Sequence, residues 1–518
     1  MLQRITTKLQ NKGYFLLLLP LFFIVHGYNT YFNFLPVDFT IFNFTVILFF
    51  SALINWLSRK LLHQEKMGNV YSFFILLYLL GFGYIHDLLK SLSPGSFFTE
   101  YRFLLPVSFF LFLLLFGILK KSTFDLAKFY LFLNTVFILL LSFETIFSIR
   151  QYSLSKKGNN LIDARFSVYN NFQKTVQAKP DTSNPDIYFL VFDAMPSTQA
   201  MKEEWGFNNS LLDSFLNNNR FNTATSAKSN YNITVLSVSS MMNMCYLPPF
   251  NYNSDEIAMY FKAGASIIDN SLTRILANKN YQIRQYQPIS LSGTDLPNPP
   301  FFQKMITMNF FYQTLPGRIY RDLSWNIYRI KLPYFRQHFI SKIEKINNAH
   351  KQTVLKTADL VKETCAKEKE KPQFVYGHFM LPHEPYIFDS TGKIKPAQQT
   401  IIGSLSEEKQ KEAFTEQVLY ANKIIQDLIT HIKTNNRRNT IIILAGDHGY
   451  RNLHGRKKYM TFDVLVSIYF PNNQYSNLYN NMSSVNIFRI VLNHATGSQL
   501  PLLKDSSIFI NYNSPVNN

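Results

Sequence analysis

Residues 439–449 read NTIIILAGDHG, and this stretch decides the fold of the carboxyl-terminal part of the chain. Thr440 to Leu444 form a short apolar run, which is typical of a strand buried on both faces of a parallel sheet. Asp447 and His448 follow at the carboxyl end of the strand, where open α/β sheets bind ligands. The two side chains could bind a metal, or they could simply form a turn.

Two further stretches repeat the pattern of a buried strand followed by a polar side chain. DIYFLVFDAM predicts a strand over Ile187 to Phe192 that ends on Asp193. A carboxylate at the end of a buried strand is costly unless a cation or hydrogen bonds compensate its desolvation, so two such ends favour a metal site. FVYGHFMLPHEPY predicts a third strand, which leads to His378 and His383. We interpret His378 as a packed histidine because it lies within the strand.

The apolar residues gather at the amino terminus. The chain has 518 residues, 47% of them hydrophobic, yet the mean hydropathy is only -0.05. A chain of this length is expected to form more than one structural unit. Residues 1–150 contain apolar stretches close to the roughly 20 residues that a bilayer requires. We expect five spans, at about 14–31, 39–57, 70–85, 103–119 and 126–149.

The basic residues suggest how these spans are oriented. Lys and Arg cluster before the first span and in the second-to-third and fourth-to-fifth loops. By the positive-inside rule the amino terminus is cytoplasmic, and an odd number of spans places the rest of the chain outside. Four further spans argue against a cleaved signal peptide. The formal charge of +19 could indicate nucleic-acid binding, but loops beside anionic lipid explain it as well, and we expect no nucleic acid.

We therefore predict a membrane domain followed by an extracytoplasmic α/β domain. Residues 1–150 are expected to form five transmembrane helices, residues 151–185 a connector, and residues 186–518 an α/β/α sandwich with catalytic function. The expected location is the bacterial cytoplasmic membrane, with the catalytic domain in the periplasm or outside the cell. Cys245 and Cys365 could form a disulfide there, but the sequence leaves their pairing open.

A run of hydroxyl residues supplies a candidate nucleophile. Thr234 opens the stretch TVLSVSSMMNM, which predicts the start of a helix. A hydroxyl residue at such a place is usually a helix cap. It could also attack a substrate, because free N–H groups and the helix dipole at a helix amino terminus favour an alkoxide and an incoming anion.

Together these motifs resemble the sulfatase branch of the alkaline phosphatase superfamily. The five-span front end resembles its membrane-anchored phosphotransferases, the lipoteichoic acid synthases and lipid A phosphoethanolamine transferases. The sulfatase signature C-x-P-S-R-A-S-L-L-T-G aligns with TVLSVSSMMNM without a gap, and Thr234 falls on the nucleophile position. Val238 replaces the arginine of the signature, so that guanidinium is missing. Thr in place of Cys argues against sulfatase chemistry, which requires formylglycine, and implies a phospho-threonine intermediate.

The resemblance also implies a metal site. Its ligands would be Asp193, Thr234, Asp447 and His448. This set suits zinc or manganese better than calcium, which prefers six or more oxygens; magnesium or calcium remain alternatives. Ala194 replaces the second acid of the family's Asp-Asp pair, and Tyr450 stands where many relatives have Glu.

Further residues match family positions that contact the substrate. His383 lies in H-x-P-Y and could act as a general acid toward the leaving group. His454 and either Lys457 or Lys458 correspond to a downstream His and Lys that hold anion oxygens, although the lysines could also form a solvated turn.

The function implied is the transfer of phosphoglycerol or phosphoethanolamine from a phospholipid to an envelope glycan or lipid. A sulfatase or phosphodiesterase that transfers the group to water is an alternative. So is a degenerate relative that only binds its ligand.

Overall fold

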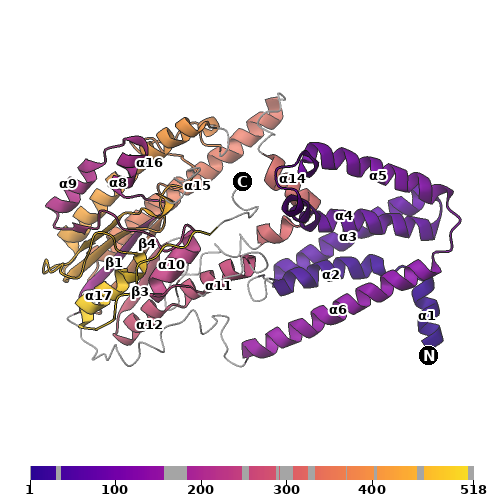
Figure 1. Cartoon of the computed structure of the whole chain (residues 1–518), viewed down its shortest axis with the longest axis horizontal. Helices are drawn as coiled ribbons and strands as arrows, with labels where there is room; N and C mark the ends of the chain where they lie inside the picture. Colours follow the sequence, from indigo (N-terminus) through magenta and orange to yellow (C-terminus); the bar gives the residue numbers. More distant parts are fainter. Residues whose placement is uncertain are drawn as a thin grey trace. The chain divides into compact units, whose positions relative to one another are not determined.

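The computed structural model describes residues 2–30, 35, 37–156, 184–247, 256–286, 291, 307–324, 333–368, 370–401, 405–451 and 460–510. The chain forms two compact units, shown in Figure 1. The first contains residues 1–158 and 302–326, and the second contains residues 159–301 and 327–518. Most of the predicted connector, residues 157–183, lies outside the described residues.

The first unit is built from apolar helices. They are α1 (Leu2–Asn11), α2 (Phe15–Thr30), α3 (Val37–Leu62), α4 (Glu65–Leu92), α5 (Tyr101–Lys121), α6 (Ala127–Lys156) and α14 (Leu315–Leu323), with a short 3-10 turn, η1 (Phe97–Thr99). Four of them, α3 to α6, are long and apolar enough to cross a membrane. Helices α1 and α2 meet at an angle of 89°, and this bent pair would be a fifth span. The helical membrane domain expected from the sequence is confirmed.

The bend between α1 and α2 is held by Asn134 of α6, which is fully buried. Its amide nitrogen donates to the carbonyl oxygens of Leu9, at 2.7 Å, and Lys12, at 2.8 Å. Its amide oxygen accepts from the backbone N–H of Phe15 at 2.7 Å. A single side chain thus satisfies three backbone groups that the break in the helix leaves without helical partners.

Helix α14 belongs to the first unit although it lies far along the chain from the other helices. Its Arg318 is fully buried and forms an ion pair with Asp87 of α4. The same guanidinium donates to the carbonyl oxygens of Tyr312, at 2.7 Å, and Gly83, at 3.2 Å. Buried charge is tolerated here because it is both paired and hydrogen-bonded.

The second unit is organised around a six-stranded sheet with the order β2-β6-β5-β1-β4-β3. The strands are β1 (Asp186–Phe192), β2 (Asn222–Thr223), β3 (Gln282–Tyr286), β4 (Gln373–Phe379), β5 (Thr440–Gly446) and β6 (Val466–Tyr469). Strands β3, β4, β1 and β5 are parallel to one another, and β6 is antiparallel to both β5 and β2. Every residue of β1, β4 and β5 is buried, as the continuous apolar runs in the sequence predict.

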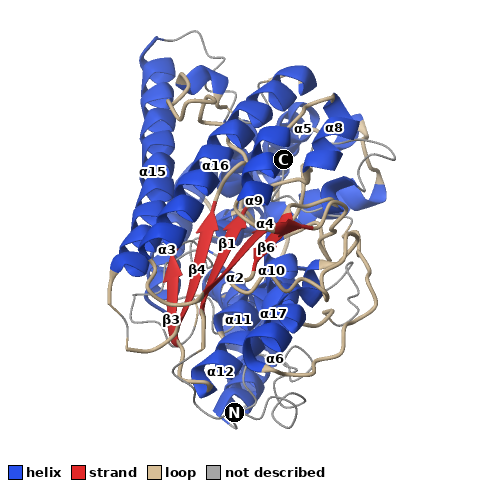
Figure 2. Ribbon diagram, turned by 90° about the vertical axis from the view of Figure 1, so that its left-hand side faces the viewer, coloured by secondary structure: helices blue, strands red, loops and turns tan. Residues whose placement is uncertain are grey.

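Helices cover both faces of this sheet, as Figure 2 shows. The helices of this unit are α8 (Thr198–Trp205), α9 (Ser210–Asn218), α10 (Thr234–Asn243), α11 (Glu256–Ile268), α12 (Ser271–Asn278), α15 (Pro333–Ala366), α16 (Glu407–Asn435) and α17 (Ile487–Thr496). Short 3-10 turns occur at η3 (Ala397–Gln399) and η5 (Ser484–Asn486). Helices α15 and α16 lie on one face, and α10 and α17 lie on the other. This arrangement is the predicted α/β/α sandwich.

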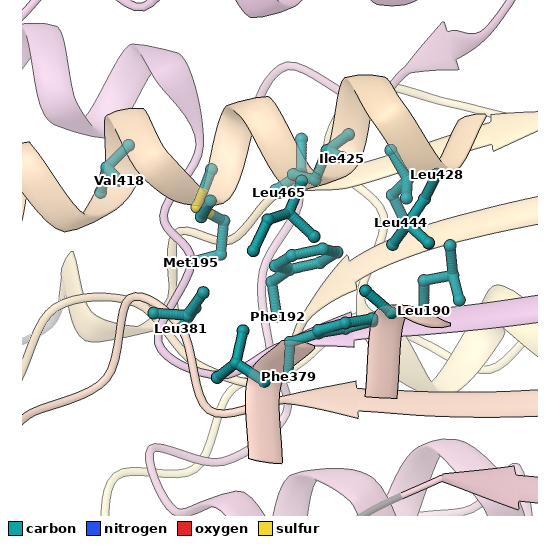
Figure 3. Packing of buried hydrophobic residues seen from close by; sticks show 14 of the residues in the cluster. Leu190, Phe192, Met195, Phe379, Leu381, Val418, Ile425, Leu428, Leu444 and Leu465 are labelled. Carbon is teal, nitrogen blue, oxygen red and sulfur yellow. The ribbon is translucent and has the colours of Figure 1, made fainter. Parts of the chain in front are cut away.

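The alternation of side chains along β1 explains why both faces are covered. Leu190 and Phe192 join the cluster that packs under α16 with Ile425 and Leu428, as seen in Figure 3. Phe189 points to the other face, where its ring lies 4.8 Å from that of Phe488 in α17. Because successive residues of a strand point to opposite faces, a wholly apolar strand requires helices on both sides.

Candidate metal centre

The parallel register of the central strands brings two acids together. Phe192, the last residue of β1, pairs with Gly446, the last residue of β5. Asp193 and Asp447 directly follow these two residues in the chain, and both acids are buried. Two adjacent strands therefore end on neighbouring carboxylates at the carboxyl edge of the sheet, where ligands bind in such folds.

Close packing of the backbone shapes this edge. A Cβ atom on Gly446 would lie 2.2 Å from the carbonyl oxygen of Met195. A Cβ atom on Gly449 would lie 2.8 Å from the carbonyl oxygen of Asp463. Both glycines of the GDHG motif are therefore required by contact with neighbouring backbone, and they flank the two polar residues on either side.

Two histidines join the acids. His448 Nε2 lies 3.4 Å from Asp193 Oδ1 and 3.7 Å from Asp447 Oδ2. His378 Nε2 lies 3.4 Å from Asp193 Oδ2. His378 pairs with Val191 in the parallel register of β4 and β1, which places it close to the end of β1. Our interpretation of His378 as a packed histidine missed this position at the cluster.

His383 is the third imidazole at the cluster. Potential ligand atoms of Asp193, His383 and His448 all lie within 4.8 Å of one another, as do those of Asp193, His378 and Asp447. Asp193 is common to both groups. The cluster of Asp193, His378, His383, Asp447 and His448, called the acid-histidine cluster below, thus combines two carboxylates with three imidazoles.

Hydrogen bonds fix the orientation of the imidazoles. Nδ1 of His448 lies 2.7 Å from the carbonyl oxygen of Gly449, and Nδ1 of His378 lies 2.7 Å from the hydroxyl of Tyr376. A carbonyl can only accept, so Nδ1 of His448 carries the hydrogen and Nε2 presents a lone pair. Partners of this kind orient the histidine ligands of metal sites.

Four buried atoms of the acid-histidine cluster have no hydrogen-bond partner among the described residues. They are Asp193 Oδ1, His378 Nε2, Asp447 Oδ2 and His448 Nε2. Leaving buried polar atoms unsatisfied is costly. A divalent cation between them would satisfy all four. The residues present therefore fit the metal that the sequence predicts.

The imidazoles also affect the ionisation of Asp193. Burial by itself would raise the pKa of this carboxyl. The favourable electrostatic contacts with His383, His378 and His448 outweigh burial, so the pKa lies well below its ordinary value of 3.8. Burial and the nearby carboxylates Asp447 and Asp193 raise the pKa of the Tyr376 phenol, which keeps it neutral beside His378. The cluster therefore presents an ionised acid beside a neutral phenol.

His383 and Arg451 form a second contact at the edge of the acid-histidine cluster. Nδ1 of His383 lies 2.6 Å from the carbonyl oxygen of Glu384, so Nδ1 must donate. Its Nε2 contacts the guanidinium of Arg451, which can only donate. Both ring nitrogens of His383 therefore have a partner in this arrangement. Arg451, half-buried, was not among the residues that the sequence analysis singled out.

Thr234 is the first residue of α10 and is half-buried. The preceding Ile233 has extended backbone, with φ of -129° and ψ of 128°, so the helix begins at Thr234, whose N–H is among the free N–H groups of its first turn. Asn232 exchanges two hydrogen bonds with the backbone of Ile510, at 2.9 and 3.1 Å, and thereby anchors the chain before the helix. The place suits a nucleophile, and that role for Thr234 stays a prediction.

Other sequence expectations have different outcomes. His454, Lys457 and Lys458 lie outside the described residues. Tyr450, which stands where many relatives have Glu, is buried and packs its ring 4.6 Å from that of Phe414 in α16.

The two cysteines, Cys245 and Cys365, are free thiols in the structure.

Comparison with models of protein families identifies the family to which the chain belongs. The family model named Sulfatase matches residues 197–497, which is more than half of the chain. The chain belongs to the sulfatase family. The resemblance seen in the sequence motifs is thereby confirmed, together with the sulfatase-like fold. A search of curated proteins found no match.

Solved structures similar to this sulfatase-family chain include three phosphoethanolamine transferases. The periplasmic domain of EptC from Escherichia coli is 11% identical, covers 66% of this chain and 93% of its own, and has a TM-score of 0.39. EptA, an integral membrane lipooligosaccharide phosphoethanolamine transferase from Neisseria meningitidis, is 13% identical, covers 94% and 97%, and has a TM-score of 0.38. The periplasmic domain of EptC from Campylobacter jejuni is 10% identical, covers 62% and 92%, and has a TM-score of 0.35.

Proposed function

We propose that this sulfatase-family protein is a metal-dependent phosphotransferase of a bacterial inner membrane. It would move phosphoglycerol or phosphoethanolamine from a phospholipid to a cell-envelope glycan or lipid, with the catalytic unit on the outer side. The observation that carries the proposal is the set of four unpartnered atoms that converge from Asp193, His378, Asp447 and His448. A chain that combines such a site with apolar, membrane-spanning helices suits a substrate that is itself a membrane lipid.

Zinc suits the cluster best. Two carboxylates and two or three imidazoles match the nitrogen and oxygen ligands of zinc sites, whereas calcium prefers six or more oxygens. Asp193, His378, Asp447 and His448 would hold the ion. When bound, zinc stabilises charge on phosphoryl oxygens and lowers the pKa of a hydroxyl that it contacts.

Thr234 would be the nucleophile. A bond forms between Thr234 Oγ and phosphorus while the bond from phosphorus to the diacylglycerol oxygen breaks. Thr234 loses its proton, and the departing oxygen gains one. In the second step the acceptor hydroxyl loses its proton as its oxygen bonds to phosphorus, the bond from Thr234 Oγ to phosphorus breaks, and Thr234 regains a proton. Free N–H groups at the start of α10 would bind the anionic group during both steps.

His383 would contact the phosphoryl or leaving group, and His454 with Lys457 or Lys458 would hold anion oxygens. Nδ1 of His383 donates to the carbonyl oxygen of Glu384, and this bond orients the ring so that Nε2 points away from that carbonyl. Its Nε2, which contacts Arg451, would be the nitrogen that protonates the leaving group as a general acid.

The test is to trap the covalent intermediate. The full chain, loaded with zinc in lipid micelles, is mixed with isotopically labelled phosphatidylethanolamine or phosphatidylglycerol, quenched, and digested for mass spectrometry. We expect a phosphoethanolamine or phosphoglycerol adduct on Thr234 in the wild type and none in Thr234→Ala. Thr430→Ala, which changes an exposed threonine on α16, is the matched control. Turnover without any adduct on Thr234 would refute the proposed intermediate.

A further inference from the structure

The nucleophile stretch lacks a cation at the place where the sulfatase signature has one. Val238 occupies the arginine position of that signature and is fully buried in α10. A valine can neither neutralise nor hydrogen-bond a phosphoryl oxygen. If the chain binds a phosphodiester anion, the charge must be supplied from another part of the fold.

Arg451 contacts the acid-histidine cluster. It follows the GDHG motif by two residues and contacts Nε2 of His383, a member of the acid-histidine cluster. It also lies close enough to Tyr386 to lower the pKa of that phenol, although burial raises it more. Arg451 is half-buried, so its charge is less screened by water than that of a surface arginine.

The charges at the site favour a cation here. Asp193 and Asp447 together balance a divalent metal, so the charge of an incoming phosphodiester has to be compensated by other cationic residues, for which Lys457 or Lys458 and Arg451 are available. Arginine remains charged at all physiological pH values, and its guanidinium presents five N–H donors. The contact with His383 uses one side of this group, and the remaining donors can bind oxygens of a phosphoryl group.

We propose that Arg451 binds the phosphoryl oxygens of the substrate and so supplies the guanidinium that is missing at Val238. Arg451 would thus be a substrate-binding residue, and His383 would help to orient it. The inference rests on the proposed function, since it assigns a residue to the phosphoryl group that the chain is proposed to transfer. It differs from that function in requiring only anion binding, which can be measured without transfer.

The experiment measures the binding of inorganic phosphate to the zinc-loaded full chain by calorimetry, together with zinc content. Arg451→Gln removes the charge, and Arg451→Lys keeps it without the planar fork. Arg437→Gln is the matched control, because Arg437 is exposed and its ion pair with Glu368 is long, at 3.8 Å. We expect Arg451→Gln to retain zinc and to bind phosphate about 10- to 100-fold more weakly, which is the range for a lost charge-assisted hydrogen bond. Arg451→Lys should fall between it and the wild type.

Two results would overturn the inference. Unchanged phosphate binding in Arg451→Gln would show that the guanidinium does not contact the anion. Loss of zinc in both variants would show that Arg451 acts on the metal ligands instead. If phosphate binding depends on Arg451 but no adduct forms on Thr234, the inference stands and the proposed transfer through Thr234 fails. If Arg451→Gln does not fold, Arg451→Lys still tests the inference, because the loss of the planar guanidinium weakens a bidentate contact with phosphate.

Discussion

Nε2 of His378 lies 3.4 Å from Oδ2 of Asp193, and both residues are buried, His378 in β4 and Asp193 directly after the neighbouring strand β1. The other ring nitrogen of His378 lies 2.7 Å from the hydroxyl of Tyr376. A buried histidine held from behind by a hydroxyl and facing a carboxylate has the arrangement of a metal ligand. The relationship extends the metal centre to a third strand, β4, beyond the two strands that end on acids.

We therefore expect His378→Gln to weaken zinc binding. Loss of an orienting partner alone reduces metal affinity about 10- to 100-fold, so loss of the ligand nitrogen should cost at least as much. Competition with a chromogenic chelator measures the affinity. His338→Gln, which changes an exposed histidine on α15, is the control. Equal zinc affinity in the two variants would exclude His378 from the site.

Gly446→Ala should disturb both the fold and the metal site. The new Cβ would lie 2.2 Å from the carbonyl oxygen of Met195, which is backbone and cannot rotate away. Overpacking of this kind costs about 1–3 kcal/mol or more. Urea denaturation monitored by circular dichroism should show reduced stability, and zinc content should fall with it. Gly117→Ala, where no atom lies within 4 Å of the added carbon, should have little effect. A Gly446→Ala variant as stable as the wild type would contradict this contact.

The stability of the metal-free protein should depend on pH through Asp193. Its pKa in the folded protein lies well below its ordinary value of 3.8, because the imidazoles outweigh the effect of burial. A carboxyl with a lowered folded pKa stabilises the protein above its unfolded pKa, and this contribution is lost as the pH falls. Thermal melting of the chelator-treated chain between pH 7 and pH 3 should therefore show a loss of stability below about pH 4 that is reduced in Asp193→Asn. Identical acid profiles would show that the carboxyl is not stabilised by its neighbours.

Asn134→Ala should destabilise the helical unit. It removes the partners of the Phe15 N–H and of the carbonyl oxygens of Leu9 and Lys12. Each buried polar group left without a partner costs about 1–3 kcal/mol. Thermal denaturation in detergent should show a lower melting temperature than in Asn43→Ala, which removes only a bond to a carbonyl in its own helix. Protease cleavage near residues 11–14 should also become faster. If neither changes, other contacts hold the bend.

The sequence predicted the sandwich and the strand ends correctly because both follow from local patterns. Unbroken apolar runs indicate strands buried on both faces, and Asp193 and Asp447 each follow such a run directly. The register that sets Phe192 beside Gly446 results from pairing between distant segments and has no local signal. The sequence therefore predicted an acid at each strand end, and the structure shows that the two strands are adjacent and that the acids meet.

The contacts of two residues at the acid-histidine cluster could not be predicted from the sequence, for related reasons. His378 lies inside an apolar run, where a histidine usually packs, and only the pairing of β4 with β1 turns it toward Asp193. Arg451 follows a Gly-Tyr pair, and an arginine in a loop normally faces water. Its contact with His383 depends on how the loops after β4 and β5 meet. In both cases the sequence does not reveal which distant segments of the chain lie next to each other.

The central pairing of β1 with β4 and β5 also bears on how the protein matures. Asp193 and His378 precede α16 in the chain, whereas Asp447 and His448 follow it. A nascent polypeptide that ends before β5 would contain Asp193 and His378 on the paired strands β1 and β4, but it would lack Asp447 and His448. Catalytic activity would therefore appear only after β5 has paired with β1. Prematurely terminated chains should be inactive toward lipids.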